Sequence, residues 1–152
     1  MAIRRGVAPA IVAGGLTGAT CDFIAAMLIY NLPALTVGKA VARGWFGKAA
    51  MQGGNDVAAI GIASHYAILL VAAAIFVFAS LRWPVLRNRA WIVGPLFGAG
   101  IYLVMHYIVL PLSALHAISN PQGIQLVEEV LGHMFVIGLP IALWARYFVG
   151  RD

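Results

Sequence analysis

The sequence predicts an all-α, polytopic membrane protein: a four-helix transmembrane bundle with a short amphipathic helix in its outer loop. Hydrophobic residues make up 62% of the 152 residues and charged residues only 10%, and the mean hydropathy is +0.93. A soluble domain of this size could not bury so much apolar surface. The chain also contains four apolar runs of about 20 residues, the length that crosses a bilayer.

These runs place the whole chain in one transmembrane domain, residues 1–152. Short charged or polar stretches separate them, as is typical of integral membrane proteins. The predicted spans cover about 8–30, 57–81, 91–115 and 124–147.

The outer loop, residues 34–51, has its own pattern. On a helix, Val37, Val41 and Trp45 would share one face, and Lys39 and Arg43 would lie opposite. This pattern predicts an amphipathic helix at the membrane surface, which covers the top of the bundle or docks a partner.

Basic residues predict the orientation. They gather at both chain ends and in the turn between the second and third spans, at Arg4, Arg5, Arg82, Arg87, Arg89, Arg146 and Arg151. By the positive-inside rule, both termini and that turn are cytoplasmic. The net charge of +5 therefore fits lipid headgroups and does not indicate nucleic acid.

Each predicted span carries at least one ionisable residue. Asp22, His65 and His106 are each 17 residues from a cytoplasmic arginine, and His133 is 13 residues from one. At 1.5 Å per residue these depths are roughly 20–25 Å. Glu129 lies four residues before His133, on the same helical face. We expect these side chains to form one layer in the outer half of the bilayer.

Ionisable groups in membrane spans usually face the interior and mark function. The sequence therefore predicts a metal or haem site with His65, His106, His133 and Glu129 as ligands, supported by Asp22 and Tyr102. Imidazoles favour transition metals, here Zn, Cu, Fe or Mn, and two of them could hold haem b. A single buried histidine would more simply be a hydrogen-bonded core residue.

The strings "SHYAILLVAAAIFVFA", "GPLFGAGIYLVMHYIVLPLSAL" and "EEVLGHMFV" resemble the last three helices of YagU-type bacterial inner-membrane proteins. The resemblance covers about residues 57–148. It implies an inner-membrane location and carries over His65, His106, Glu129 and His133, but it implies no reaction.

Two other functions stay open. One is a proton-conducting half-channel, since titratable groups can move protons. The other is an accessory subunit of a larger membrane complex, or a homo-oligomer, with structural histidines. The sequence predicts no catalytic residues, because it has no nucleophile elbow, phosphate-binding loop or H-E-x-x-H motif.

Overall fold

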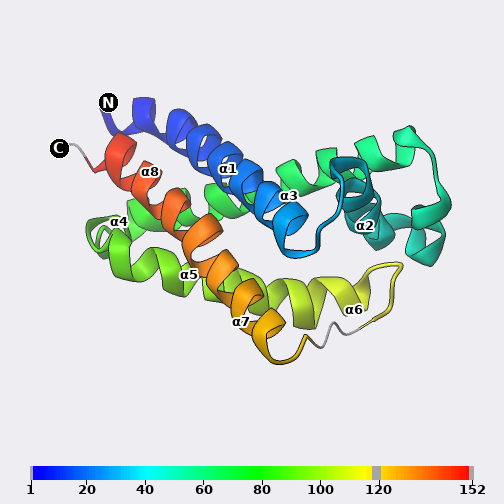
Figure 1. Ribbon diagram of the computed structural model, residues 1–152. Helices are drawn as coiled ribbons and strands as arrows, with labels where there is room; N and C mark the ends of the chain where they lie inside the picture. Colours follow the sequence, from blue (N-terminus) through cyan, green and yellow to red (C-terminus); the bar gives the residue numbers. More distant parts are fainter. Residues whose placement is uncertain (1, 118–120, 151–152) are drawn as a thin grey trace.

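The computed structural model of the chain consists of helices joined by turns (Figure 1). It describes residues 2–117 and 121–150, and of residues 2–5 it describes only the backbone. No strand occurs in this described part, which confirms the predicted all-α class. Four helices there are long and apolar enough to cross a membrane: Gly6–Ile29, Asn55–Arg82, Ala90–Leu112 and Ile124–Val149.

The first two spans are single helices. Helix α1 covers Ala2–Ile29 and α3 covers Asn55–Arg82. Between them, α2 (Ala34–Phe46) and a 3₁₀ segment (Gly47–Gln52) occupy the loop for which the sequence predicts an amphipathic helix. The short helix α4 (Val85–Asn88) lies in the turn that leads to the third span.

The third span is interrupted by a π-helical segment. Helix α5 (Ala90–Val104) continues through the first π segment, Met105–Val109, into α6 (Leu110–Leu112). Pro111 lies just beyond that segment. A proline has no N–H and its ring clashes with the carbonyl four residues back, so the wider turn upstream relieves the clash.

The fourth span repeats this construction. Helix α7 (Ile124–Leu131) continues through the second π segment, Gly132–Gly138, into α8 (Leu139–Val149), and Pro140 follows the segment. Such π segments are uncommon and often occur at functional sites.

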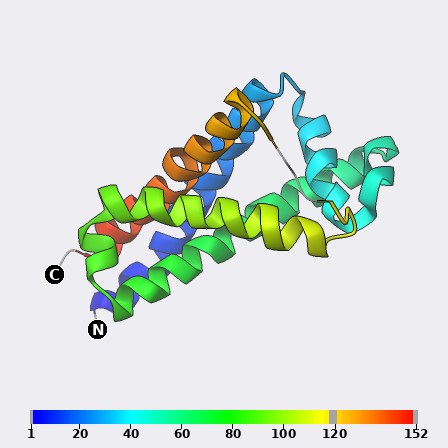
Figure 2. The ribbon, with the colours of Figure 1, turned by 90° about the horizontal axis from the view of Figure 1, so that it is seen from below.

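The helices are close together at one end and spread apart at the other. Both termini and α4 lie at the close end, and α2 lies at the opposite end (Figure 1). Figure 2 shows α1 with α7 and α8 diverging from α3 with α5 and α6, while α2 bridges the gap. We call the end that carries α2 the splayed end.

The apolar core lies toward the termini. The rings of Phe76 on α3 and Phe97 on α5 meet there with centroids 5.0 Å apart. Ile137 and Ile141, from the fourth span, are 1% and 0% exposed within the same cluster. This core holds the membrane-spanning helices together near the termini.

Small residues bring the third and fourth spans into backbone contact. A Cβ atom added at Gly98 would lie 2.7 Å from the Cα of Met134 and closer still to the carbonyl oxygen of His133. Gly138 meets the backbone of Gly94 in the same way. Close approach through glycine is how helices often pack in lipid, and this crossing lies directly beside His133.

Helix α2 is fixed across the splayed end by two sets of contacts. Gly61 of α3 packs against the backbone of Gly38 on α2, where a side chain would not fit. The loop after α6 reaches α2 through a hydrogen bond from Ala114 N–H to Gly44 O, 2.9 Å long. Helix α2 therefore covers the space between the diverging helices.

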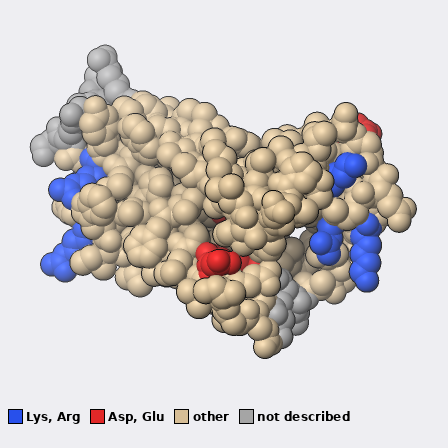
Figure 3. All heavy atoms as spheres, viewed as in Figure 1, with Lys and Arg blue, Asp and Glu red and all other residues tan. Residues whose placement is uncertain are grey.

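Charge is distributed as a membrane protein requires. On the face shown in Figure 3, Lys and Arg gather at the two ends, and the broad band between them shows no Lys or Arg and one acidic patch, over α7. Side chains along the band, such as Val71 and Ile75, are each 59% exposed. Arg151 and the side chains of Arg4 and Arg5, used above for orientation, lie outside the described residues.

Candidate functional site

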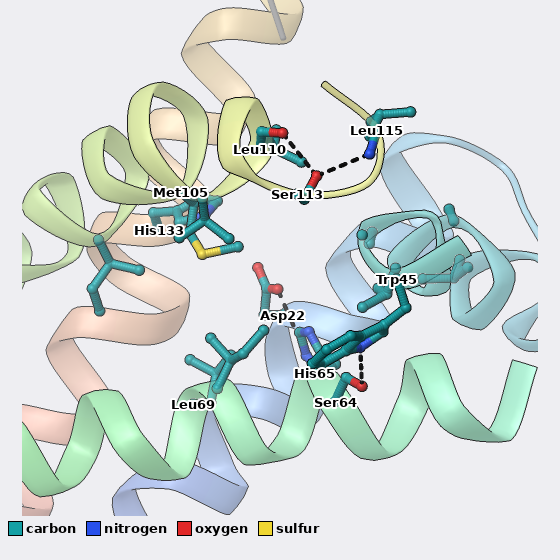
Figure 4. A pocket seen from close by; sticks show the side chains of 18 of the residues that line it. Asp22, Trp45, Ser64, His65, Leu69, Met105, Leu110, Ser113, Leu115 and His133 are labelled. Atoms are coloured by element: carbon teal, nitrogen blue, oxygen red, sulfur yellow. Dashed lines mark hydrogen bonds and ion pairs between the residues drawn. The ribbon is translucent and has the colours of Figure 1, made fainter. Parts of the chain in front are cut away.

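A cavity of about 880 Å³ lies where the helices separate. Helices α1, α2 and α3, the third span and the second π segment form its mostly apolar wall. Figure 4 shows Asp22 near the middle, with its carboxylate turned into the open space. His65 from α3 and His133 from the second π segment line the same space, which we call the central cavity.

The Asp22 carboxylate is only loosely held. Its Oδ2 lies 3.8 Å from His65 Nε2, beyond hydrogen-bond distance. His65 Nε2 is instead 2.9 Å from Ala19 O. Because a carbonyl only accepts, Nε2 carries the proton, and Nδ1 is the acceptor of a neutral ring. Among the described residues no side chain or amide donates a hydrogen bond to Asp22, whose side chain is 23% exposed.

A second polar group joins three helical segments. His106 Nε2, on the first π segment, lies 3.0 Å from Glu129 Oε2 on α7. The hydroxyl of Tyr30, just after α1, donates to Glu129 Oε1. Both partners of the His106–Glu129 pair are only 11% exposed. We call these three residues the Tyr30–Glu129–His106 cluster; it ties the first span to the third and fourth.

Both ring nitrogens of His106 are occupied. Its Nδ1 donates to Tyr102 O, 3.0 Å away. Its Nε2 is hydrogen-bonded to Glu129 Oε2 through one proton, which is carried either by the imidazole or by the carboxyl group. The ring of Tyr102 also stacks on that imidazole, with centroids 4.0 Å apart. The ring and carbonyl of Tyr102, and not its hydroxyl, therefore hold His106 in place.

His133 stands between the two groups. Its Nδ1 donates to Glu129 O at 2.8 Å, and its ring centroid lies 6.1 Å from that of His106. It also lines the central cavity together with Asp22. Its Nε2 has no hydrogen bond within residues 2–117 and 121–150, so this nitrogen is available to a ligand in the central cavity.

Both histidines whose rings approach across two spans lie in π segments. His106 and His133 are each the second residue of their segment. A π turn inserts about one extra residue, which rotates the side chains that follow relative to a regular helix. Glu129 and His133 are in contact through ring and backbone, because His133 Nδ1 donates to Glu129 O. The Glu129 carboxylate lies against His106.

The residues predicted as one site thus form two groups joined by His133. Asp22 and His65 belong to the central cavity, whereas His106, Glu129 and Tyr102 belong to the neighbouring cluster. Within the described part of the chain, no three His, Cys, Asp or Glu side chains lie close enough to hold one metal ion.

Sequence reasoning missed two participants. Tyr30 ends the first apolar run, where an aromatic residue usually marks the membrane interface. Trp45 lines the central cavity and donates from Nε1 to Ser64 Oγ at 2.9 Å. No spacing rule connects Tyr30 with Glu129, 99 residues later, so only the fold could pair them.

The pairing changes the chemistry of Tyr30. Partial burial, together with the hydrogen bond to Glu129, raises the pKa of its hydroxyl to about 12. Tyr30 therefore stays protonated and keeps donating to Glu129 into the alkaline range in which an ordinary tyrosine ionises.

Comparison with known proteins gives no match. No protein-family model, curated protein or solved structure matches this chain.

Proposed function

We propose that this multi-pass membrane protein binds a small, membrane-soluble molecule in the central cavity. The observation that carries the proposal is Asp22, an ionisable side chain that faces an apolar cavity without a hydrogen-bond donor among the described residues. A carboxylate in hydrocarbon is costly to maintain, and those found there usually serve a function.

The cavity has the properties of a ligand site. Small-molecule pockets typically have volumes of about 300–1,000 Å³, apolar walls and a few polar groups that fix orientation. The central cavity has a volume of about 880 Å³ and places Asp22, His65 and His133 among aliphatic and aromatic side chains. The Tyr30–Glu129–His106 cluster supports its wall from one side.

The location is part of the same proposal. The resemblance to YagU-type proteins supports the bacterial inner membrane, and the basic residues support cytoplasmic termini. The central cavity would then open in the outer half of the bilayer, within reach of outer-leaflet lipids and lipid-soluble compounds.

The test is to fill the cavity. Ala26 lies four residues after Asp22 on α1 and lines the cavity, so Ala26→Trp places an indole over the carboxylate. Ile24 is 50% exposed and lies outside the lining, so Ile24→Trp is the matched control. Purified proteins are extracted with organic solvent, and the extracts are analysed by mass spectrometry.

We expect a compound in stoichiometric amount from wild type and Ile24→Trp, and its loss from Ala26→Trp. If the extracts of all three proteins contain the same bulk phospholipid and no stoichiometric compound, the proposal is overturned.

Metal or haem binding is the second candidate. It is favoured by the fact that Asp22, His65 and His133 line one cavity and that each of these two histidines has one ring nitrogen without a hydrogen bond among the described residues. The side chains would have to move together to coordinate one ion, and both nitrogens of His106 are already hydrogen-bonded. Elemental analysis and an absorption spectrum test this candidate. Stoichiometric metal or a Soret band, lost in His133→Ala, would support it.

Association with a larger complex or a second copy of the chain is a separate proposal about partners. The particle mass of the protein extracted in a mild detergent decides it, since one chain has a mass of 16.1 kDa.

A further inference from the structure

We propose that the ligand of the central cavity is a protonated amine with an apolar body, and that Asp22 binds its ammonium group. This inference depends on the proposed function and adds the charge and the hydrogen-bonding character of the ligand. It follows from which polar atoms in the cavity wall are already satisfied.

The donors in the wall are used within the protein. Ser64 Oγ donates to Ile60 O at 2.7 Å, and Ser113 Oγ donates to Leu110 O at 2.7 Å. The indole N–H of Trp45 donates to Ser64. Each of these three groups therefore donates its proton to a neighbouring protein atom.

The remaining donors follow the same rule. The Tyr30 hydroxyl donates to Glu129. His65 donates through Nε2 to one backbone carbonyl, and His133 donates through Nδ1 to another. In neutral rings the other nitrogen of each histidine is an acceptor.

The polar atoms left for a ligand are thus acceptors: the two Asp22 oxygens, His65 Nδ1 and His133 Nε2. A ketone, a phosphate or a carboxylate would bring further acceptors and find no donor. A protonated primary amine carries three N–H donors and no acceptor, which is the complement of this set.

The charge of the cavity agrees with this conclusion. Of the described residues that line it, Asp22 is the one carboxylate, and none is Lys or Arg. Lys39 and Arg43 lie on α2, which forms part of the wall, but neither is among the lining residues. On the face shown in Figure 3, Lys and Arg appear at the two ends. With neutral imidazoles, the cavity carries one negative charge in an apolar surrounding, where the attraction of a cation is strong.

The wall also suits the rest of such a ligand. Figure 4 shows Leu69 and Met105 near Asp22, and Trp45 beside His65. The aliphatic side chains would contact an apolar body. The hydrogen bond to Ser64 fixes the indole of Trp45, and an aromatic face attracts a nearby cation.

The experiment compares octylamine with octanol, which have the same chain but differ in charge. Binding is measured by titration calorimetry at pH 7 on protein in phosphatidylcholine nanodiscs, with empty nanodiscs as the baseline. The amine is protonated there, because alkylamines have a pKa near that of lysine, about 10.4. The variants are Asp22→Asn, which keeps the shape and removes the charge, and Glu128→Gln, which removes an exposed carboxylate outside the cavity.

We expect wild type and Glu128→Gln to bind octylamine roughly tenfold or more tightly than octanol, and Asp22→Asn to lose this preference. Suppose that octylamine and octanol bind equally, that Asp22→Asn leaves this binding unchanged and that Ala26→Trp abolishes it. This result would overturn the proposal of an amine ligand but not the proposed ligand site in the cavity. Binding of neither probe above empty nanodiscs, combined with extracts that hold no stoichiometric compound, would overturn both.

Discussion

Replacing Gly98 by alanine tests the backbone crossing that positions His133. The added methyl group would lie 2.7 Å from Met134 Cα and nearer still to His133 O, whereas ordinary contacts begin at 3.4 Å. These neighbours are backbone atoms, which cannot rotate away as a flexible side chain does. The third and fourth spans must therefore move apart, and the second π segment must move with them.

The magnitude follows from two opposing effects. Alanine is a better helix former than glycine, by about 1 kcal/mol in a helix interior. Overpacking of a close contact costs roughly 1–3 kcal/mol. Gly100 supplies the control, because it lies on the same span with no atom within 4 Å of an added Cβ. Gly100→Ala gains the same helix propensity without the clash. The difference in the free energy of unfolding between the two variants therefore measures the cost of overpacking alone.

Unfolding in nanodiscs, followed by circular dichroism during heating, measures this difference. We expect Gly98→Ala to be less stable than Gly100→Ala by roughly 1–3 kcal/mol. We also expect it to lose ligand from the central cavity, because His133 moves. Equal stability of the two variants would refute the close crossing and the position it assigns to His133.

Three further results are expected. Ile75→Lys, on the exposed face of α3, should make membrane insertion less favourable by about 3–4 kcal/mol, since the isoleucine contribution is lost and the lysine cost is added; a glycosylation assay measures this, and unchanged insertion would contradict a lipid-facing position. Glu129→Ala should destabilise the protein by roughly 1–3 kcal/mol, because it leaves the hydroxyl of Tyr30 and the imidazole of His106 without their partner, whereas Glu128→Ala should change the melting temperature little. Because the pKa of Tyr30 is raised to about 12, the stability its neutral hydroxyl contributes should persist up to about pH 10 and fall as the pH rises through 12. Ultraviolet titration of wild type against Tyr30→Phe measures this, and an ordinary tyrosine titration near 10 would contradict the hydrogen bond.

The architecture was predictable because it depends on quantities that sequence contains directly. Bilayer thickness sets the length of an apolar run that can cross the membrane. The four spanning helices could therefore be predicted from the lengths of the apolar runs. Asp22, His65 and His133 were predicted to face the interior because an ionisable group in lipid is costly, and all three line the central cavity.

The division of the site into two groups was not predictable. Depth along a helix can be counted from the sequence, but a hydrogen-bond partner cannot: the Glu129 carboxylate lies against His106, whereas Asp22 lies in the central cavity. Tyr30 was missed because its partner Glu129 is distant in sequence and its position is that of an interfacial aromatic. The splayed shape also depends on where glycines allow close crossing, which requires the neighbouring helix to be known.

Native mass spectrometry of the intact protein released from nanodiscs tests the central claim most directly, because it counts bound molecules on each chain. The account predicts a population that carries one small molecule, retained in Ile24→Trp and absent from Ala26→Trp. A bare chain in wild type, or the same bound mass in both tryptophan variants, would contradict it.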